Sequence, residues 1–299
     1  MTPERVLVLG AGGMLGTALV RELAQAGVVV IAAARRPLAG LPAGVTQAAP
    51  GDLRDAAALS RLVAEAAPDV VVNAAGLIKQ RPEAEDPAAA IETNALLPHR
   101  LAALCAARDA RLIHVSTDCV FSGSTEGRRG PAGYRETDPP DPTDLYGRSK
   151  LLGETTGPHC LTLRMSLIGR EAAGTRHGLV EWFLAAPGPV RGYARALFSG
   201  LTTPVAARLV LSILRDYPRL HGLWHAAAEP ISKLDLLRAM RDRAKPGLGI
   251  EAVDGPAIDR RLDGTALHAA TGWSAPAWEA MLDELLGAPG QEAAVRGRA

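Results

Sequence analysis

Short apolar runs alternate with helical patterns along the first half of the chain, and this alternation constrains the fold most strongly. The predicted strands are residues 5–9, 28–34, 70–74, 111–115 and 161–165. Between them lie stretches whose apolar residues recur at helical spacing, at 17–25, 55–66 and 87–108. Strands separated by helices pair in parallel through right-handed crossovers. The sequence therefore predicts an α/β fold with a Rossmann-type doubly wound parallel sheet.

A glycine-rich turn joins the first predicted strand to the first predicted helix, with the spacing Gly-x-x-Gly-x-x-Gly at residues 10–16. The first glycine permits a sharp turn, the second lets the backbone approach a pyrophosphate, and the third lets helix and strand pack closely. The helix N-terminus adds amide donors for phosphate oxygens. We therefore expect a dinucleotide to bind at Gly10, Gly13, Met14, Leu15 and Gly16.

Two arginines, Arg35 and Arg36, follow the second predicted strand and bear on which dinucleotide binds. No acidic residue occurs from 28 to 51, where an NAD site has a carboxylate for the ribose 2′-hydroxyl. Guanidinium groups suit a 2′-phosphate, so the sequence favours NADPH, with NADH as the alternative. Asp52 and Leu53 are candidate adenine contacts, and capping of the next helix is the alternative role of Asp52.

Polar and small residues follow two further predicted strands. Ala74, Ala75 and Gly76 come after one strand, and Thr117 and Asp118 come after another. Ligands of doubly wound sheets bind at the carboxyl ends of the strands. We therefore expect both segments to lie beside the glycine-rich turn.

Tyr146 and Lys150 are four residues apart in a chain that has only four tyrosines and in which 33 basic residues include few lysines. On a helix this spacing puts both side chains on one face. A tyrosine hydroxyl beside an ammonium group is a usable acid or base near neutral pH. The alternative is a surface helix with an unrelated Tyr and Lys.

These motifs together, including Asn-Ala-Ala-Gly at 73–76, Ser-Thr-Asp at 116–118 and Tyr-Gly-Arg-Ser-Lys at 146–150, resemble the extended short-chain dehydrogenase/reductases. The stretch 113–154 is similar to the dTDP-4-dehydrorhamnose reductase branch. The resemblance implies that Thr117 binds a substrate carbonyl, that Tyr146 protonates the alkoxide, and that Lys150 binds the nicotinamide ribose and lowers the pKa of Tyr146. The implied reaction is NADPH-dependent reduction of a nucleotide-linked 4-keto-6-deoxyhexose.

Further site residues follow from the same resemblance. It implies a cofactor contact at Asn94 and substrate contacts at Asp118, Cys119, Val120, Trp182 and Phe198. One departure concerns Ala18, which stands where rhamnose-forming relatives have a glutamate of a magnesium-bridged dimer, so we expect no metal. Another is the segment 192–203, which lacks the substrate-region pattern of those relatives, so the sugar is left open.

Two alternative functions remain open. One is an NAD-dependent nucleotide-sugar epimerase or dehydratase of the same superfamily. The other is a non-catalytic regulatory subunit resembling that of methionine adenosyltransferase. Arg35 and Arg36 favour the reductase over the first, and the intact Thr117, Tyr146 and Lys150 favour it over the second.

Composition limits the classes of partner and the cellular compartment that are expected for this chain. A net charge of +1 and 4% aromatic residues argue against nucleic acid binding, and the absence of an 18-residue apolar stretch argues against a membrane span or secretory signal. Three cysteines without CxxC spacing suit a reducing cytoplasm. We expect a monomer or homodimer with an NAD(P)-binding domain at 1–170, a smaller α/β substrate-binding part at 171–286 and a flexible tail at 287–299.

Overall fold

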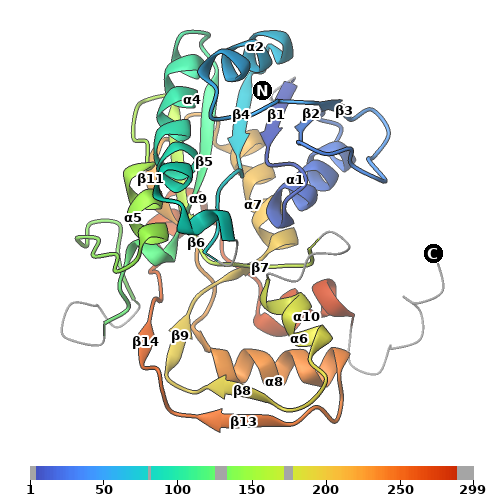
Figure 1. Ribbon diagram of the computed structural model, residues 1–299, viewed down its shortest axis with the longest axis vertical. Helices are drawn as coiled ribbons and strands as arrows, with labels where there is room; N and C mark the ends of the chain where they lie inside the picture. The colour runs from blue at the N-terminus through green and yellow to red at the C-terminus, as the bar shows by residue number, and fades with distance from the viewer. Residues whose placement is uncertain (1–4, 80–81, 125–132, 172–177, 288–299) are drawn as a thin grey trace.

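A computed structural model describes residues 5–79, 82–124, 133–171 and 178–287. A helix-flanked sheet forms the upper part of the molecule in Figure 1, and a smaller α/β part lies below it. The expected tail at 287–299 lies outside the described residues except for its first residue.

The central sheet has seven parallel strands in the order β11-β6-β5-β4-β1-β2-β3. Their bounds are β1 Arg5–Leu9, β2 Val29–Ala33, β3 Thr46–Ala48, β4 Val70–Asn73, β5 Arg111–Thr117, β6 Cys160–Met165 and β11 Gly222–His225. The chain starts in the middle of the sheet, moves to one edge, and then returns to build the other side. This reversal beside β1 confirms the predicted Rossmann-type doubly wound sheet.

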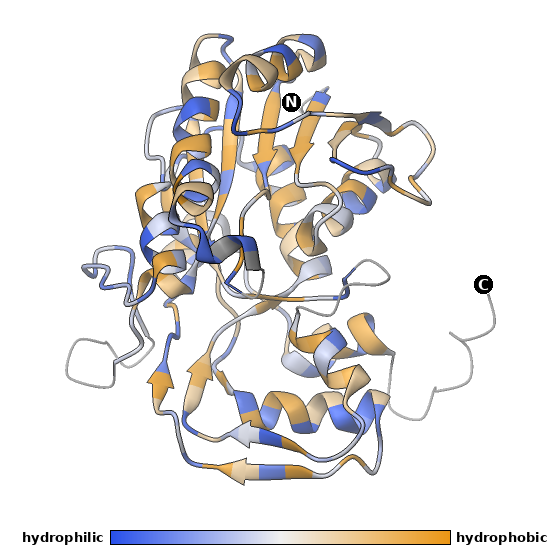
Figure 2. Ribbon diagram, in the orientation of Figure 1, coloured by the Kyte–Doolittle hydropathy of each residue, from blue (hydrophilic) through white to orange (hydrophobic). Residues whose placement is uncertain are grey.

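Both faces of the sheet are covered, so each strand divides its residues between two cores. Val6 and Val8 of β1 enter one core, whereas Leu7 and Leu9 enter the other, and all four are fully buried. Helices α1 (Met14–Gln25) and α7 (Thr203–Asp216) cover the first face, and α2 (Ala56–Ala66) and α4 (Leu97–Ala106) cover the second. Figure 2 shows the resulting apolar strands. Burial on both faces explains why the strands are continuous apolar runs.

The helix predicted at 87–108 is interrupted. It comprises α3 (Pro87–Ala90), a π-helical segment η2 (Ile91–Leu96) and α4. Pro98 lacks the N–H that would bond to the carbonyl of Asn94 in an α-helix. That carbonyl faces Gly153 instead, where a Cβ atom would lie only 1.9 Å from the Asn94 oxygen. The π segment therefore lets the end of another helix pack here.

That other helix is α5 (Leu145–Leu152), and it follows a 3₁₀ turn, η3 (Asp118–Val120), and a long connection. A second 3₁₀ turn, η1 (Pro82–Glu85), precedes α3. Short strands β7 (Leu167–Ile168) and β10 (Leu201–Thr202) pair in parallel where the chain leaves the large sheet. Among these elements, α5 packs on η2, on η3 and against β5, so it lies beside the carboxyl end of β5.

Among its described residues, the smaller part contains two short sheets and three helices. Strand β9 (Ala196–Phe198) lies between β12 (Ile231–Ser232) and β14 (Ile258–Asp259), and β8 (Val190–Tyr193) pairs with β13 (Ile250–Val253). The helices are α6 (Leu179–Ala185), α8 (Lys233–Ala244) and α10 (Trp278–Leu286). Ser232 caps α8, and its hydroxyl accepts a bond of 3.0 Å from the Asp235 amide.

The second half of the chain also completes the large sheet. β11 pairs in parallel with β6, α7 packs against α1, and α9 (Thr265–Thr271) packs beside β11. A boundary at residue 170 does not separate these elements from the sheet that they complete. None of the helices in the described part of the chain combines the length and apolar character that crossing a bilayer requires.

Candidate active site

The glycine-rich turn packs directly on the loop after β4. Gly10 has a φ of 74°, in the region that favours glycine. A Cβ on Gly10 would lie 2.8 Å from both the Ala74 carbonyl oxygen and the Ala75 nitrogen. Only a residue without a side chain fits here, so the loop containing Ala74, Ala75 and Gly76 and the turn form one backbone surface.

Gly16 and Gly13 set how α1 leaves this turn. A Cβ on Gly16 would lie 2.1 Å from the Gly10 oxygen, which explains why helix and strand can pack so closely only with glycine. Gly13 is the N-cap residue of α1 and leaves the first turn of the helix uncovered by a side chain. Leu15 is 6% exposed and belongs to the core, so it can offer a ligand its backbone rather than its side chain. Met14 lies against Gly169.

The predicted 2′-phosphate and adenine contacts lie beyond β2 and β3. Arg35 and Arg36 are exposed. Asp52 is held by Arg54, whose Nε lies 3.0 Å from both carboxylate oxygens. The hydrogen bonds from Arg54 lower the pKa of Asp52 to about 2, and the charge of Arg35 acts in the same direction. The N-cap of α2 is Asp55 rather than Asp52, so the capping alternative for Asp52 was wrong.

Leu53 and Gly76 are less exposed than these charged residues. Leu53 packs partly buried against the core between α2 and the sheet. Gly76 has Asn94 Oδ1 so close that a Cβ would lie 3.3 Å from it. Asn94 itself is 1% exposed, and its amide accepts from the Leu77 amide at 2.8 Å and donates to the Leu77 carbonyl at 2.9 Å. It also donates to Ser149 Oγ at 3.1 Å, so Asn94 ties the loop after β4 to α5.

Thr117 ends β5 and meets Tyr146 from α5. The Thr117 side chain is buried, accepts a bond of 3.1 Å from the Cys119 amide and donates to Asp118 Oδ1 at 3.2 Å. The Thr117 hydroxyl lies close enough to Tyr146 to lower the pKa of the tyrosine against the larger effect of burial. The structure thus brings together the two residues that the sequence assigned to the carbonyl.

Gly147 explains how α5 reaches Thr117. A Cβ on Gly147 would lie 2.2 Å from the Cys119 carbonyl oxygen, so glycine is required for α5 to pack on η3. Asp144 caps the helix and accepts a bond of 2.7 Å from the Gly147 amide. Lys79 lies 3.6 Å from the Asp144 carboxylate and fixes the start of α5 to the loop after β4.

Lys150 lies one turn after Tyr146 and points into the sheet. Its side chain is almost completely buried, donates to the Val115 carbonyl at 2.7 Å, and has Nζ 3.5 Å from His114 Nε2. Burial lowers the pKa of Lys150 to about 8, and the Glu154 carboxylate opposes this shift.

The expected effect of Lys150 on Tyr146 is not present in this geometry. Burial raises the pKa of Tyr146 above its usual range, the nearby Cys119 thiol adds to the shift, and the Thr117 hydroxyl opposes it. The prediction of a lowered tyrosine pKa was therefore wrong for this structure, because burial of the hydroxyl outweighs the groups that lower its pKa, and Lys150 is not among those groups. Tyr146 consequently keeps its proton at neutral pH.

The predicted substrate residues differ in accessibility. Asp118 and Val120 are buried, and Cys119 is partly exposed, with burial raising the pKa of its thiol to about 11. Trp182 is 45% exposed on α6. Phe198 is buried against the Trp278 ring, at 5.7 Å between centroids. Its ring therefore packs inside the smaller part and is not exposed.

Lys233 and Arg260 are functional candidates that the sequence analysis missed. Lys233 Nζ lies 3.6 Å from the centroid of the Phe198 ring, and the charge of Asp118 raises its pKa while burial lowers it more. Arg260 Nε donates to the Phe121 carbonyl at 2.9 Å, and its Nη1 lies 3.7 Å from Cys119 Sγ. The signal available in the sequence was the scarcity of lysine, because three of its four lysines, Lys79, Lys150 and Lys233, surround this region.

A buried ion pair between β6 and the segment after α5 contacts the carboxyl end of β5. Arg164 of β6 lies 2.7 Å from Glu154, and both side chains are less than one-tenth exposed. Ser116 donates to the same carboxylate at 2.7 Å, and Arg164 Nη1 lies 3.2 Å from His225 Nε2. Burial and the Arg164 charge lower the pKa of His225 to about 3, so this histidine is neutral.

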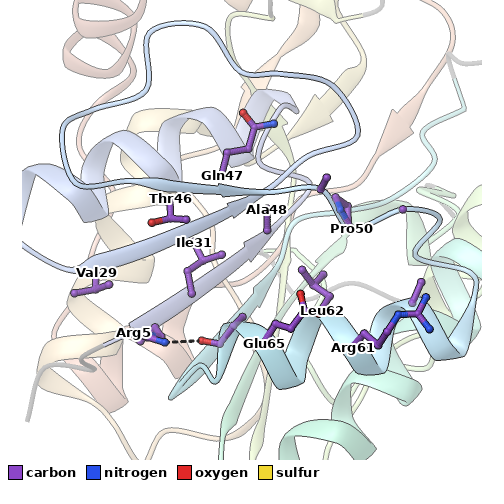
Figure 3. Close-up of a pocket in the computed structure, with 14 residues that line it drawn as sticks. Arg5, Val29, Ile31, Thr46, Gln47, Ala48, Pro50, Arg61, Leu62 and Glu65 are labelled. Carbon is purple, nitrogen blue, oxygen red and sulfur yellow. Dashed lines mark hydrogen bonds between the residues drawn. The ribbon is translucent and has the colours of Figure 1, made fainter.

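One cavity lies away from the predicted site residues. A hollow of about 670 Å³ opens between α2 and the β2–β3 edge of the sheet, and Figure 3 shows Ile31, Thr46 and Leu62 among its lining residues. The Arg5 guanidinium donates to the Ala66 carbonyl at 3.1 Å at one end. None of the predicted site residues lines it. In the described part of the chain, His, Cys, Asp and Glu side chains form no group of three or more that could hold a metal ion.

The chain is similar in sequence to several proteins named dTDP-4-dehydrorhamnose reductase. Over 151 residues the chain is 37% identical to dTDP-4-dehydrorhamnose reductase of Mycobacterium tuberculosis, covering 50% of this chain and 44% of that protein. Over 168 residues it is 39% identical to dTDP-4-dehydrorhamnose reductase of Burkholderia thailandensis, covering 55% and 50%. The chain therefore spans about half the length of the curated relatives that it matches.

Solved structures extend the likeness to the whole fold. The structure of dTDP-4-dehydrorhamnose reductase from Bacillus anthracis in complex with NADP superposes with a TM-score of 0.77, covering 95% of this chain and 99% of that one at 19% identity. The family model described as "RmlD substrate binding domain" matches residues 4–288, nearly the full length of the chain. With both parts of the molecule inside that match, the chain belongs to the RmlD substrate binding domain family.

Proposed function

We propose that this chain is an NADPH-dependent reductase of a nucleotide-linked 4-keto-6-deoxyhexose. The observation that carries the proposal is the packing of α5 on η3 and against β5, which places Tyr146 beside Thr117 at the carboxyl end of β5. Two hydroxyl groups that meet at this edge can polarise one carbonyl oxygen, and the backbone surface around Gly10 lies at the same edge of the sheet. The names of the relatives and the NADP complex of a structural neighbour support the same reaction.

The protein residues supply the proton and hold the substrate. A nicotinamide cofactor, when bound, supplies the hydride that is transferred to the carbonyl carbon. Thr117 donates a hydrogen bond to the carbonyl oxygen, and Tyr146 transfers its proton to that oxygen as the alkoxide forms. The raised pKa of Tyr146 suits this role, because an acid must hold its proton until the oxygen becomes basic. Solvent then returns a proton to the tyrosine.

The cofactor site follows the edge of the sheet. The glycine-rich turn with Met14 and Leu15 would hold the pyrophosphate, and Ala74, Ala75 and Gly76 would face the cofactor from the other side. Arg35 and Arg36 would contact the 2′-phosphate, since both guanidinium groups are exposed beyond β2. Asp52 is committed to Arg54, so in this proposal the adenine contact comes from Leu53 and from the Asp52–Arg54 pair as a unit.

Substrate binding falls to the smaller part. Residues 1–170, completed by α7 and β11, would form the NADPH-binding unit, and the remainder of 171–286 would hold the nucleotide sugar. Lys79, Lys233 and Arg260 carry positive charge around Asp118 and Cys119, which suits a diphosphate. Trp182 is available to contact the sugar or base.

A panel of nucleotide keto-sugars, followed by the loss of NADPH absorbance, tests the proposal. We expect stoichiometric oxidation of NADPH with at least one of them, and Arg35→Ala should weaken NADPH binding more than NADH binding. Purified protein that retains NAD and consumes no NADPH would identify an epimerase or dehydratase instead. A stable complex with a larger enzyme and no turnover would identify a regulatory subunit.

The setting of the enzyme is part of the proposal. We infer a cytoplasmic monomer or homodimer, and the three cysteines are free thiols in the structure. Ala18 offers no metal ligand, so EDTA should change neither turnover nor the elution volume in size-exclusion chromatography. Loss of activity together with loss of a dimer, both restored by magnesium, would contradict this.

A further inference from the structure

His114 and Asn73 form a buried polar pair behind the candidate active site. Both side chains are fully buried, and the two residues are direct neighbours in the parallel pairing of β4 with β5. Asn73 Nδ2 lies 3.1 Å from His114 Nδ1, and His114 Nε2 lies 3.5 Å from Lys150 Nζ. The imidazole ring therefore connects the loop after β4 with the lysine of the Tyr-x-x-x-Lys motif.

The hydrogen bonds of Asn73 define the tautomer of His114. Asn73 Oδ1 accepts a bond of 3.2 Å from the Ala75 amide, so the amide nitrogen of Asn73 faces the ring. An amide nitrogen only donates, so His114 Nδ1 accepts and the ring proton lies on Nε2. Burial keeps the pKa of His114 well below its usual value, and the Lys150 charge adds to this, so the ring stays neutral.

Lys150 meets this Nε2–H group in one protonation state only. A neutral amine can donate to the Val115 carbonyl and accept from Nε2–H, whereas an ammonium group has donors alone. A charged Lys150 would need Nε2 as an acceptor, with the ring proton on Nδ1. The Asn73 amide would then have to turn over to accept from Nδ1, and Ala75 would lose its acceptor.

The other charged groups around this chain of contacts are few. Glu154, beyond the end of α5, raises the pKa of Lys150, but its carboxylate is already paired with Arg164 of β6. His99 of α4 acts on His114 in the same direction as Lys150. Tyr146, one turn before Lys150 on α5, is neutral at physiological pH. None of these groups supplies an acceptor to Nε2.

We propose that His114 is a positioning residue that couples the protonation of Lys150 to the hydrogen bond between Asn73 and Ala75. The bonded Ala75 belongs to the loop that packs on Gly10, so a change at Lys150 reaches the backbone surface of the proposed cofactor site. The consequence for NADPH rests on the proposed function, whereas the coupling itself is a property of the unliganded protein.

NMR of the protein with ¹⁵N-labelled histidine tests the coupling without any ligand. The His114 signals are identified by their loss in His114→Gln. Between pH 6 and pH 10 we expect the ring to stay neutral while its proton moves from Nδ1 to Nε2, with a midpoint near 8, where Lys150 loses its charge. A ring that keeps one tautomer over this range, or becomes charged within it, would overturn the proposal.

Two substitutions of Lys150 act as matched controls for that experiment. Lys150→Met removes the charge and should hold the ring proton on Nε2 at every pH. Lys150→Arg keeps the charge and should hold it on Nδ1. A pH-dependent tautomer that survives in both variants would show that a different group drives the change. Circular dichroism and the melting temperature identify any variant that fails to fold, and the other then decides.

NADPH titration tests the functional consequence. The amide of His114→Gln can take the place of Nε2 beside Lys150, whereas that of His114→Asn can reach only the place of Nδ1 beside Asn73. We expect NADPH affinity to fall about tenfold more in the Asn variant than in the Gln variant at equal melting temperature, as for one lost hydrogen bond to a charged group. Equal losses would contradict the positioning role. Wild-type protein that binds no NADPH would refute the proposed function, and the tautomer experiment would still decide the coupling.

Discussion

The two sides of the candidate active site differ in composition, because one is formed by backbone and the other by polar side chains. Around Gly10 and Gly16 the site consists of backbone, and its shape requires residues that have no side chain. Around β5 and α5 it consists of buried polar side chains, among them His114, Lys150 and Glu154. A backbone surface tolerates little added volume, whereas a buried polar network tolerates no lost partner. Substitutions should therefore damage the protein for different reasons on the two sides, through added volume at the backbone surface and through a lost polar partner in the buried network.

Loss of the Glu154 charge should have the largest effect on stability. Glu154→Gln leaves the buried Arg164 guanidinium without its counter-ion, and we expect the free energy of unfolding to fall by about 3 kcal/mol. Urea denaturation measures it. The control is Asp52→Asn, which breaks the exposed pair with Arg54 on the other side of the site and should leave the unfolding midpoint unchanged. Equal effects of the two substitutions would remove the distinction between the two sides.

Removal of the Tyr146 hydroxyl should affect rate rather than stability. Tyr146→Phe should lower kcat by about 10² or more, because it deletes the proton donor, while NADPH affinity stays near that of the wild type. Steady-state kinetics and an NADPH titration separate the two quantities. Near wild-type turnover of the Phe variant would refute the acid role of Tyr146.

Addition of one methyl group should be enough to damage the backbone side. In Gly16→Ala the new Cβ meets the Gly10 carbonyl, and we expect a loss of about 1–3 kcal/mol of stability together with weaker NADPH binding. Gly12→Ala is the matched control, since its Cβ would meet the flexible end of Leu38 at 3.1 Å and the Ala34 Cβ at 3.8 Å, which is an ordinary contact distance. An unchanged melting temperature in Gly16→Ala would mean that the turn is looser than the structure indicates.

The pH dependence of stability should report on Lys150. Its pKa in the folded protein, about 8, lies below the value of 10.5 for an unperturbed lysine. Between these values the unfolded chain binds more protons, so stability gains from Lys150 as pH rises, by up to about 1.4 kcal/mol per pH unit. The difference in unfolding free energy between wild type and Lys150→Met, measured from pH 7 to 10, isolates this effect from the titration of Tyr146 and Cys119. A constant difference would contradict the lowered lysine pKa.

The same contrast explains what could be predicted from the sequence. Glycines at fixed spacing and apolar runs are local signals, so the strands β1, β2, β4 and β6 and the glycine-rich turn could be predicted from them. The pairing of Thr117 with Tyr146 followed from the family resemblance. The role of Asp55 as the cap of α2 and the π segment around Asn94 depend on single local hydrogen bonds that more than one residue could have made.

The partners of the buried side chains could not be predicted. His114 reads as one polar residue in an apolar strand, and its contacts, Asn73 and Lys150, come from elements far away in the sequence. Lys233 reaches the site from the smaller part for the same reason. The prediction of a lowered pKa for Tyr146 was wrong because the spacing gave the correct face of the helix but not how deeply the hydroxyl is buried.

The strand β11 has a consequence for how this protein is made. Until the ribosome has delivered residues 222–225, β6 is the outer strand of the sheet, with one row of backbone donors and acceptors unpaired. The nascent chain must protect that row while the intervening helices are still being synthesised. A gene fragment that ends after residue 170 would leave the row permanently open. Such a fragment should self-associate. We therefore expect that residues 1–170 cannot be produced alone as a nucleotide-binding domain.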